Sequence, residues 1–368
     1  MNSRQAIAAA QRIVVKVGSS SLTTPEGALD SLRLDVLVRA IASRAENCEI
    51  ILVSSGAIAA GLAPLGLTRR PTDLPSQQAA ASVGQSRLMA HYTAAFAEFN
   101  KTVGQVLLTV EDITRRSHYK NAHKTFGRLL ELGVIPIVNE NDTVATGEIR
   151  FGDNDRLAAL VALLVNADAL ILLSDVDGLY DAPPAAGGTL ISEVRDFSQL
   201  AGVVIGGTGS SVGSGGMATK VEAAHIASAA GIPVVLTSAA QAHGAINAEP
   251  VGTYFAATGN RKSSRTIWLL HATATRGHVV IDDGAVRAVR ERGSSLLAAG
   301  VIGVAGDFSE GDAIEVISTN GDVVARGLVQ FDAVDIPKIQ GKSTSALLSE
   351  FGAGFDKEII HRDDLVLV

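Results

Sequence analysis

Lysines, glycines and carboxylates gather in a few short stretches of this 368-residue chain. One of them, KVGSSS, carries Lys16 near the end of an apolar run that predicts a buried strand. Burying a lysine is costly unless it meets a negative partner. Gly18 and the serines after it offer backbone and hydroxyl donors for anionic oxygens. These residues predict an anion site, and a lysine that leaves the strand edge for solvent is the alternative.

A glycine-rich stretch, GTGSSVGSGGMATK, occupies residues 207–220 and ends in Lys220. Its spacing fits neither a Walker A motif nor a dinucleotide fingerprint. Consecutive backbone N–H groups at the start of a helix nevertheless bind anions, and the helix dipole assists them. The stretch therefore predicts either a phosphate-binding loop or a mobile glycine loop that caps a helix. The residues at the predicted helix start are Gly215, Gly216, Met217, Ala218, Thr219 and Lys220.

The most polar part of the first half, NENDTVATGEIRFGDNDR, covers residues 139–156. Asp142, Asp153, Asn154 and Asp155 are unfavourable choices for a core. We interpret Asp142 and Asn154 as groups that hold the ammonium and carboxylate of an amino acid, and Asp155 as a bridge between two lysines. The alternative is an exposed hairpin with acidic turns and an aspartate that caps a helix.

Two further stretches place small polar residues where strands end. SSGAIAAG, residues 54–61, offers donors at a helix start, which suits a carboxylate or phosphate, although small residues also permit tight helix–strand packing. LLSDVDGLY, residues 172–180, contains Ser174 and Asp175, which could line a nucleotide pocket. The residues after them predict a turn.

Predicted strands and helices alternate, and the strands are apolar on both faces, which predicts an α/β fold with a mainly parallel sheet. Ligands of such sheets bind beyond the carboxyl ends of the strands. Four polar clusters fall at those ends, namely residues 16–20, 54–56, 139–142 and 174–178. The predicted strands are 12–18, 49–56, 103–109, 134–142, 169–180 and 232–238, and the predicted helices are 31–47, 57–66, 76–99, 117–133, 154–166 and 217–231.

The length of the chain predicts two domains. Near residue 270 the pattern changes to short alternating runs with acidic turns, which predicts a first domain over 1–270 and a small β-rich domain over 276–368. The second domain has nine Lys and Arg against fifteen Asp and Glu, and the whole chain carries a net charge of −7. Because phosphate backbones attract basic surfaces, nucleic acid is not an expected partner.

Other classes of protein lack support in the sequence. Cys48 is the only cysteine, so it cannot form an intrachain disulfide, and it reads as a small buried side chain. The histidines lack metal-ligand spacing, and no Ser/His/Asp arrangement is evident. Nothing resembles a signal peptide, and the most apolar stretch is interrupted by Asn166 and Asp168. A cytoplasmic enzyme without a membrane partner is the default expectation.

In their order along the chain, KVGSSS, SSGAIAAG, NENDTVA, GDND, LLSDVDGLY and GSGGMATK resemble the amino acid kinase family over residues 11 to about 270. The tail resembles a PUA domain through less specific motifs. The resemblance implies a three-layer αβα sandwich followed by a small β-rich, PUA-like domain. It is closest to members that use ATP and Mg²⁺ to phosphorylate the γ-carboxylate of L-glutamate, the first step of proline biosynthesis.

The resemblance also implies roles for individual residues. Ser55, Asp142 and Asn154 would bind glutamate, and Lys16 and Lys220 would hold the transferring phosphoryl group. Asp155 would orient the two lysines. The ATP-binding residues would be Lys16, Ser174, Asp175, Ser214, Gly215, Gly216, Met217, Ala218, Thr219 and Lys220. Mg²⁺ would be held mostly by the nucleotide and water, so no protein ligand is predicted.

Partners follow from the same resemblance. It implies feedback inhibition by proline near the glutamate site, a dimer or tetramer, and a reductase that takes up the labile product. Two alternatives remain at this point. The acceptor could instead be acetylglutamate, aspartate, carbamate or UMP, or the chain could bind RNA through its PUA-like tail.

Overall fold

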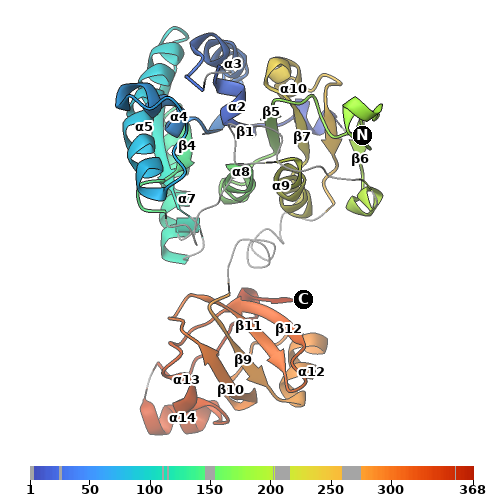
Figure 1. Ribbon diagram of the computed structural model, residues 1–368. Helices are drawn as coiled ribbons and strands as arrows, with labels where there is room; N and C mark the ends of the chain where they lie inside the picture. Colours follow the sequence, from blue (N-terminus) through green and yellow to red (C-terminus); the bar gives the residue numbers. More distant parts are fainter. Residues whose placement is uncertain are drawn as a thin grey trace. The chain divides into compact units, whose positions relative to one another are not determined.

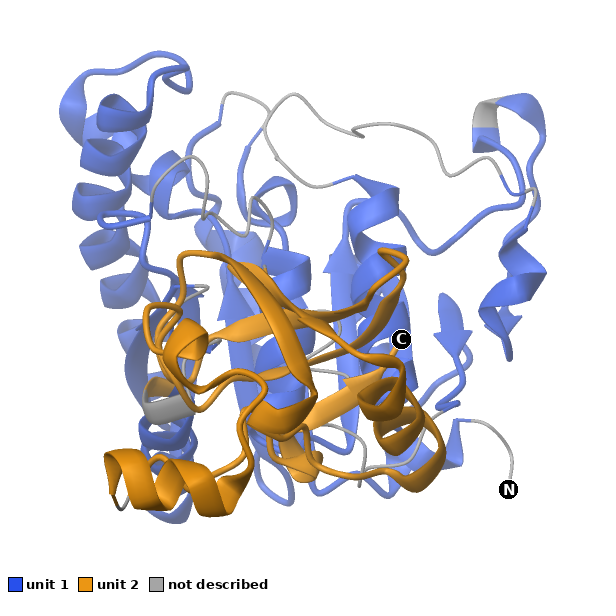
Figure 2. Cartoon of the chain, turned by 90° about the horizontal axis from the view of Figure 1, so that it is seen from below, with its two compact units in different colours: residues 1–113, 119–261 blue, residues 114–118, 262–368 orange. Residues whose placement is uncertain are grey.

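The computed structural model describes residues 4–24, 27–109, 112–113, 116–145, 154–201, 203, 216–258, 275–352 and 354–368. The chain divides into two compact units, one of residues 1–113 with 119–261 and one of residues 114–118 with 262–368 (Figure 2). The predicted boundary near residue 270 lies outside the described residues, so the exact domain limits stay a prediction.

Eight strands of the described residues form the sheet of the first unit, in the order β3-β4-β2-β1-β5-β7-β8-β6. Neighbours from β3 to β7 are parallel, β8 is antiparallel to β7, and β6 is parallel to β8. The mainly parallel sheet is therefore confirmed. The strands are β1 (Arg12–Val17), β2 (Glu49–Ser54), β3 (Thr102–Leu108), β4 (Val134–Glu140), β5 (Ala169–Ser174), β6 (Glu193–Val194), β7 (Val234–Ser238) and β8 (Thr253–Phe255).

Helices cover both faces of this sheet, which confirms the predicted αβα sandwich (Figure 1). Helices α3, α5 and α10 pack on one face through a shared apolar cluster, and α8 and α9 lie side by side on the other. The described helices of this unit are α1 (Gln5–Ala8), α2 (Ser19–Leu22), α3 (Ser31–Arg44), α4 (Ala57–Leu62), α5 (Leu74–Ala97), α7 (Arg116–Glu131), α8 (Asn154–Leu164), α9 (Met217–Ala229) and α10 (Ala242–Ile246).

The alternation of side chains along β1 decides where Lys16 points. Ile13, Val15 and Val17 belong to the apolar cluster shared with α3, α5 and α10. Because successive side chains of a strand point to opposite faces, Val14 and Lys16 face the other layer, where α8 packs against β1. An apolar strand thus delivers one lysine beneath the helix that carries the predicted carboxylates.

The second unit contains a five-stranded sheet with the order β10-β9-β11-β12-β13. The sequence predicted strands and turns here but not the helix α12 (Asp283–Arg292), which begins where Asp282 accepts a 2.7 Å hydrogen bond from the Ala285 N–H. The remaining elements are β9 (Gly277–Ile281), β10 (Val301–Gly306), β11 (Ala313–Ser318), β12 (Val323–Leu328), β13 (Leu365–Leu367), α13 (Ile336–Ile339) and α14 (Thr344–Phe351).

A helix that crosses a bilayer needs about 20 consecutive, mostly apolar residues. In the part of the chain that the structure describes, none of the helices is both long and apolar enough to span a membrane.

Candidate active site

The carboxyl ends of four neighbouring parallel strands, β4, β2, β1 and β5, carry the polar clusters that the sequence singled out. Two backbone hydrogen bonds join the loops at these ends. The Gly18 N–H donates to the Leu173 carbonyl at 3.3 Å, and the Ser55 N–H donates to the Val17 carbonyl at 3.2 Å. The predicted edge is therefore continuous, and the residues that follow β2, β1 and β5 lie next to one another.

Asp155 lies between two lysines in the first turn of α8. Lys16 from β1 forms an ion pair with its Oδ1, and the Nζ of Lys220 from α9 lies 3.1 Å from its Oδ2. All three residues are buried, with Asp155 completely inaccessible and Lys220 only 7% exposed. A carboxylate in the first turn of a helix is also stabilised by the helix dipole. Three distant segments of the sequence thus converge on one carboxylate.

The first turn of α9 is tied to the same carboxylate. The Thr219 hydroxyl lies 3.2 Å from Oδ2 of Asp155 and 2.8 Å from the carbonyl oxygen of Gly216, which precedes the helix. Two ammonium groups share one carboxylate here, so the three charged side chains together carry one net positive charge. In a buried environment this favours an anionic ligand.

A second polar cluster surrounds Asn154, the residue before Asp155. Its Nδ2 lies 2.8 Å from the Ser55 Oγ, 3.1 Å from the Ser54 carbonyl oxygen and 3.0 Å from the Asn139 Oδ1. Side chains from α8, β4 and the loop after β2 therefore meet at one point. Amide and hydroxyl groups of this kind orient carboxylates and ammonium groups without adding charge.

Two residues of α5 complete this cluster, and sequence reasoning missed both. Gln85 accepts a 2.8 Å hydrogen bond from the Asn139 Nδ2, and the Tyr92 hydroxyl lies 2.8 Å from the Ser54 Oγ. Burial raises the pKa of Tyr92, so its hydroxyl stays protonated. One feature of the sequence could have indicated Gln85. It is a polar residue in a row of small and apolar residues at helical spacing, which predicts a buried helix face.

The remaining predicted residues occupy neighbouring positions. Asp142 is half-buried in the turn after β4. Ser174 is buried at the end of β5, where its Oγ lies 3.0 Å from Oδ1 of the exposed Asp175. Of the glycine-rich stretch, Gly216 precedes α9 and Met217 to Lys220 form its first turn. Ser214 and Gly215, like Asp153, lie outside the described residues.

The donor set of the site does not suit a metal ion. Within the described ranges, no three His, Cys, Asp or Glu side chains gather as a metal-binding group. Both carboxylate oxygens of Asp155 face lysine ammonium groups, an arrangement that repels a cation. The cluster is therefore suited to the oxygens of an anion.

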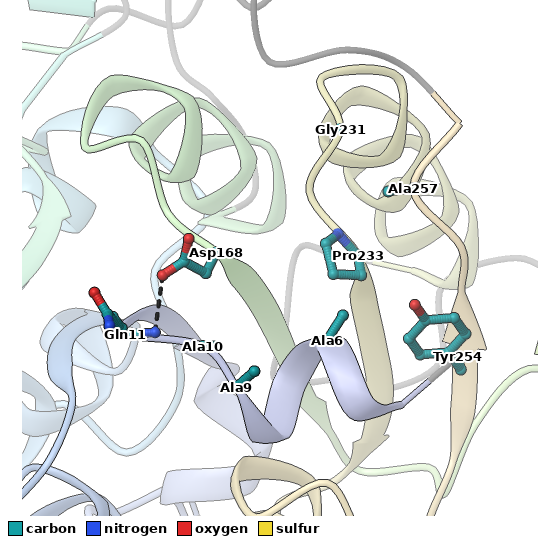
Figure 3. A pocket seen from close by; sticks show the side chains of 9 residues that line it. All are labelled: Ala6, Ala9, Ala10, Gln11, Asp168, Gly231, Pro233, Tyr254 and Ala257. Atoms are coloured by element: carbon teal, nitrogen blue, oxygen red, sulfur yellow. Dashed lines mark hydrogen bonds between the residues drawn. The ribbon is translucent and has the colours of Figure 1, made fainter. Parts of the chain in front are cut away.

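A separate pocket of about 350 Å³ lies near the amino ends of β1, β5 and β7 (Figure 3). Asp168, which lines it, accepts hydrogen bonds from the backbone N–H groups of Gln11 at 2.8 Å and Arg12 at 2.9 Å. These bonds hold the start of β1, which gives the carboxylate a structural role. The lining residues are Ala6, Ala9, Ala10, Gln11, Asp168, Gly231, Pro233, Tyr254 and Ala257, and none of them was predicted to bind a ligand.

Comparison with known proteins gives two family matches and several similar relatives. The sequence model described as the Amino acid kinase family matches residues 11–238, and that of the PUA domain matches residues 277–349. A glutamate 5-kinase of Streptomyces coelicolor is 61% identical over 368 residues, which cover 99% of this chain and 98% of the relative. Glutamate 5-kinases of Salinispora arenicola and Bifidobacterium adolescentis are 58% and 54% identical, over 99% of this chain and 100% and 98% of theirs.

Proposed function

Because the chain belongs to the amino acid kinase family, we propose that it transfers the γ-phosphoryl group of ATP to the γ-carboxylate of L-glutamate. The product is γ-glutamyl phosphate, and the reaction is the first step of proline biosynthesis. The similarity to glutamate 5-kinases over nearly the whole of both chains supports this acceptor. It disfavours acetylglutamate, aspartate, carbamate and UMP, and also a primary role in RNA binding.

The shared carboxylate of Asp155 is the observation that carries the mechanism. Two buried lysines, Lys16 from β1 and Lys220 from α9, are held on its two oxygens. Phosphoryl transfer requires chiefly alignment and neutralisation of charge. Preorganised cations in a buried site neutralise the phosphoryl oxygens without reorganising during the reaction. We assign this role to the two lysines and an orienting role to Asp155.

The chemical step needs no strong base, because the glutamate γ-carboxylate is already deprotonated. One of its oxygens attacks the γ-phosphorus of ATP and forms the new P–O bond. The bond from that phosphorus to the β–γ bridging oxygen breaks, and ADP leaves with the electron pair. No proton has to move, which accounts for a site built from lysines and amides rather than from a nucleophile and its base.

ATP would be held where strand β5 ends and helix α9 begins. The N–H groups of the first turn of α9, Met217 to Thr219, suit phosphate oxygens, and Ser174 and Asp175 lie at the end of the adjacent strand β5. Ser214, Gly215 and Gly216 would complete this loop. Mg²⁺ bound to the nucleotide would neutralise phosphate charge, and no protein side chain is assigned to it.

Glutamate would lie over the cluster around Asn154. Ser55 and Asn154 offer hydroxyl and amide groups that orient the amino acid, and Asp142 offers a carboxylate for its ammonium group. The substrate carboxylate to be phosphorylated must then reach the lysines, which is possible because Asn154 and Asp155 are consecutive residues at the start of α8.

Release of ADP from ATP and Mg²⁺ tests the acceptor. L-Glutamate is compared with aspartate, acetylglutamate, carbamate and UMP at equal concentrations. The proposal predicts turnover with glutamate at least about 100-fold faster than with any other acceptor, since buried polar groups reject ligands that leave them unpaired. Faster turnover with another acceptor would retain the family and change the substrate.

Regulation, assembly and location are further parts of the proposal. Proline shares an α-carboxylate and a charged nitrogen with glutamate, so we propose that it inhibits at or near the same cluster, which a rise in the glutamate KM with added proline would test. We also propose a dimer or tetramer, measurable by sedimentation. The product is a labile mixed anhydride, so a reductase should consume it, and ATP and glutamate as substrates favour a cytoplasmic location.

A further inference from the structure

We propose that Gln85 is a further substrate-binding residue, whose side-chain Nε2 donates a hydrogen bond to a carboxylate oxygen of the bound amino acid. This inference rests on the proposed function. Gln85 belongs to α5, far in sequence from the polar strand ends. It lies on the buried stripe of that helix with Ala81, Leu88 and Tyr92, and only 8% of its surface is exposed.

A close approach of two helices brings Gln85 to the site. The preceding residue, Gly84, packs so tightly on the first turn of α4 that a Cβ there would lie 1.7 Å from the carbonyl oxygen of Ala57. The loop of Ser55 and Gly56 immediately precedes that turn, and Gly56 enters it with a left-handed backbone at φ +102°. Position 85 is therefore held beside the loop that supplies Ser55.

The hydrogen bonds fix which way each amide points. The Asn139 Oδ1 accepts a 2.9 Å bond from the Glu140 backbone N–H, which can only donate. The Nδ2 of Asn139 must then be the donor to Gln85, at 2.8 Å. Gln85 consequently accepts this bond with its Oε1, so its Nε2 points away from Asn139. A backbone N–H thus determines the orientation of two buried side chains.

The Gln85 Nε2 has no hydrogen-bond partner in the structure as described. Leaving a buried donor unsatisfied is costly, so such groups usually meet a ligand or an ordered water. The Asn154 Nδ2 nearby is already surrounded by three protein acceptors. A substrate with two carboxylates needs additional donors at this point, and the Gln85 Nε2 supplies two N–H groups.

The alternative partner of the Gln85 Nε2 is a water molecule. The substitution Gln85→Glu distinguishes a bound water from a substrate carboxylate. Gln85→Glu keeps the acceptor for Asn139 and changes the donor into a carboxylate oxygen. A water can turn and donate to that oxygen, whereas a substrate carboxylate would be repelled. Gln85→Met removes both hydrogen-bonding groups at similar volume and serves as a second variant should the buried carboxylate impair folding.

The experiment measures kcat and the KM values for glutamate and for ATP in the ADP-release assay. Both variants should raise the glutamate KM roughly 10- to 100-fold, as expected for losing a hydrogen bond to a charged group. The ATP KM should stay within about twofold of the original value, because Gln85 lies beside the Asn139–Asn154 cluster and a merely structural defect would disturb both substrates. Gln199→Glu is the matched control, since the exposed Gln199 also uses its Oε1 as an acceptor, for the Arg195 N–H.

Three outcomes would each contradict a different part of the proposal. If the unmodified protein does not turn over glutamate, the proposed function itself fails. If it does and both variants keep a glutamate KM within about twofold of it, the assignment of Gln85 is wrong. Parallel increases in the KM values for glutamate and ATP would assign Gln85 to the structure alone and also overturn the proposal.

Discussion

The Nζ of Lys220 lies 3.1 Å from the Asp155 Oδ2, while Lys16 occupies the other oxygen of the same carboxylate. The three side chains come from α9, α8 and β1, so this contact joins strand β1 to the neighbouring helices α8 and α9. The shared carboxylate fixes the positions of both ammonium groups. Preorganisation of this kind is what an electrostatic catalyst of phosphoryl transfer requires.

Removing the charge of Asp155 should affect both stability and catalysis. In Asp155→Asn two buried lysines would lose their shared carboxylate, and breaking a buried ion pair in this way costs about 3–5 kcal/mol. We expect a lower melting temperature and a kcat reduced by about 100-fold or more, since the lysines are no longer oriented. Thermal unfolding and the ADP-release assay measure the two effects.

The matched control is Asp30→Asn, at the N-cap of α3. Asp30 accepts a hydrogen bond from the Arg33 N–H, and asparagine caps helices about equally well. This variant should keep both its melting temperature and its kcat. An Asp155→Asn protein with the kcat of the unmodified enzyme would show that the orientation of the lysines does not matter.

The contact of α5 with α4 should be sensitive to a single methyl group. Gly84→Ala would place a Cβ 1.7 Å from the Ala57 carbonyl oxygen and 2.5 Å from the Gly61 backbone nitrogen, so the helices must separate. Overpacking typically costs 1–3 kcal/mol, and we expect a loss of about 3 kcal/mol, visible as a lower melting temperature. The glutamate KM should also rise, because α4 follows the loop that carries Ser55.

A second glycine provides the comparison for this variant. Gly127 lies within α7, and a Cβ there would meet nothing within 4 Å. Gly127→Ala should therefore leave the free energy of unfolding unchanged or raise it by about 0.5–1 kcal/mol. The melting temperature should accordingly stay the same or rise. Equal effects of the two changes would mean that the α4–α5 contact is looser than the structure indicates.

Cys48 should react slowly with alkylating reagents. Burial raises the pKa of its thiol to about 11, against an ordinary value of 9.0. Since only the thiolate reacts, alkylation at pH 8 should be roughly 100-fold slower in the folded protein than in urea, and it should accelerate as the pH rises toward 11. Mass spectrometry of iodoacetamide-treated protein follows this rate. A rapid reaction at pH 8 would contradict the burial of the thiol.

The full chain should not bind RNA through its second unit. Among the residues that the structure describes, five of its lysine and arginine side chains already pair with carboxylates, namely Arg326 with Glu315, Lys338 with Asp335, Lys342 with Glu350, Lys357 with Glu310 and Arg362 with Asp363. Fluorescence anisotropy with a labelled hairpin RNA should therefore show no binding at protein concentrations up to about 100 µM. Binding that weakens steeply with added salt would overturn this expectation.

Much of the fold could be predicted because long apolar strands and amphipathic helices have clear periods. Such a pattern gave the central strands and the parallel sheet. Shorter elements escaped prediction for a physical reason. Strand β6 has two residues, Glu193 and Val194, too few to show any alternation. In α12 an early Gly284 masks the helical spacing of Val286 and Val289, and tertiary packing decides the structure there.

The candidate site was predictable where it lies at strand ends, since parallel strands bring their carboxyl ends to one edge. Lys16 and Asp155 could be paired because a lysine in a buried strand needs a negative partner. Gln85 could not be found in this way. It lies in the middle of a 24-residue helix and reaches Asn139 only through the tight packing of Gly84 on α4, which is a tertiary contact. The roles of all these residues stay predictions.

Direct capture of the product tests the central claim most sharply. An acyl phosphate reacts with hydroxylamine to give a hydroxamate, so the protein is incubated with ATP, Mg²⁺, L-glutamate and hydroxylamine, beside Lys220→Ala. We predict one hydroxamate for each ADP released, and a rate roughly 100-fold lower in the variant at an unchanged glutamate KM. ADP release without hydroxamate, or a variant as fast as the unmodified protein, would contradict the account.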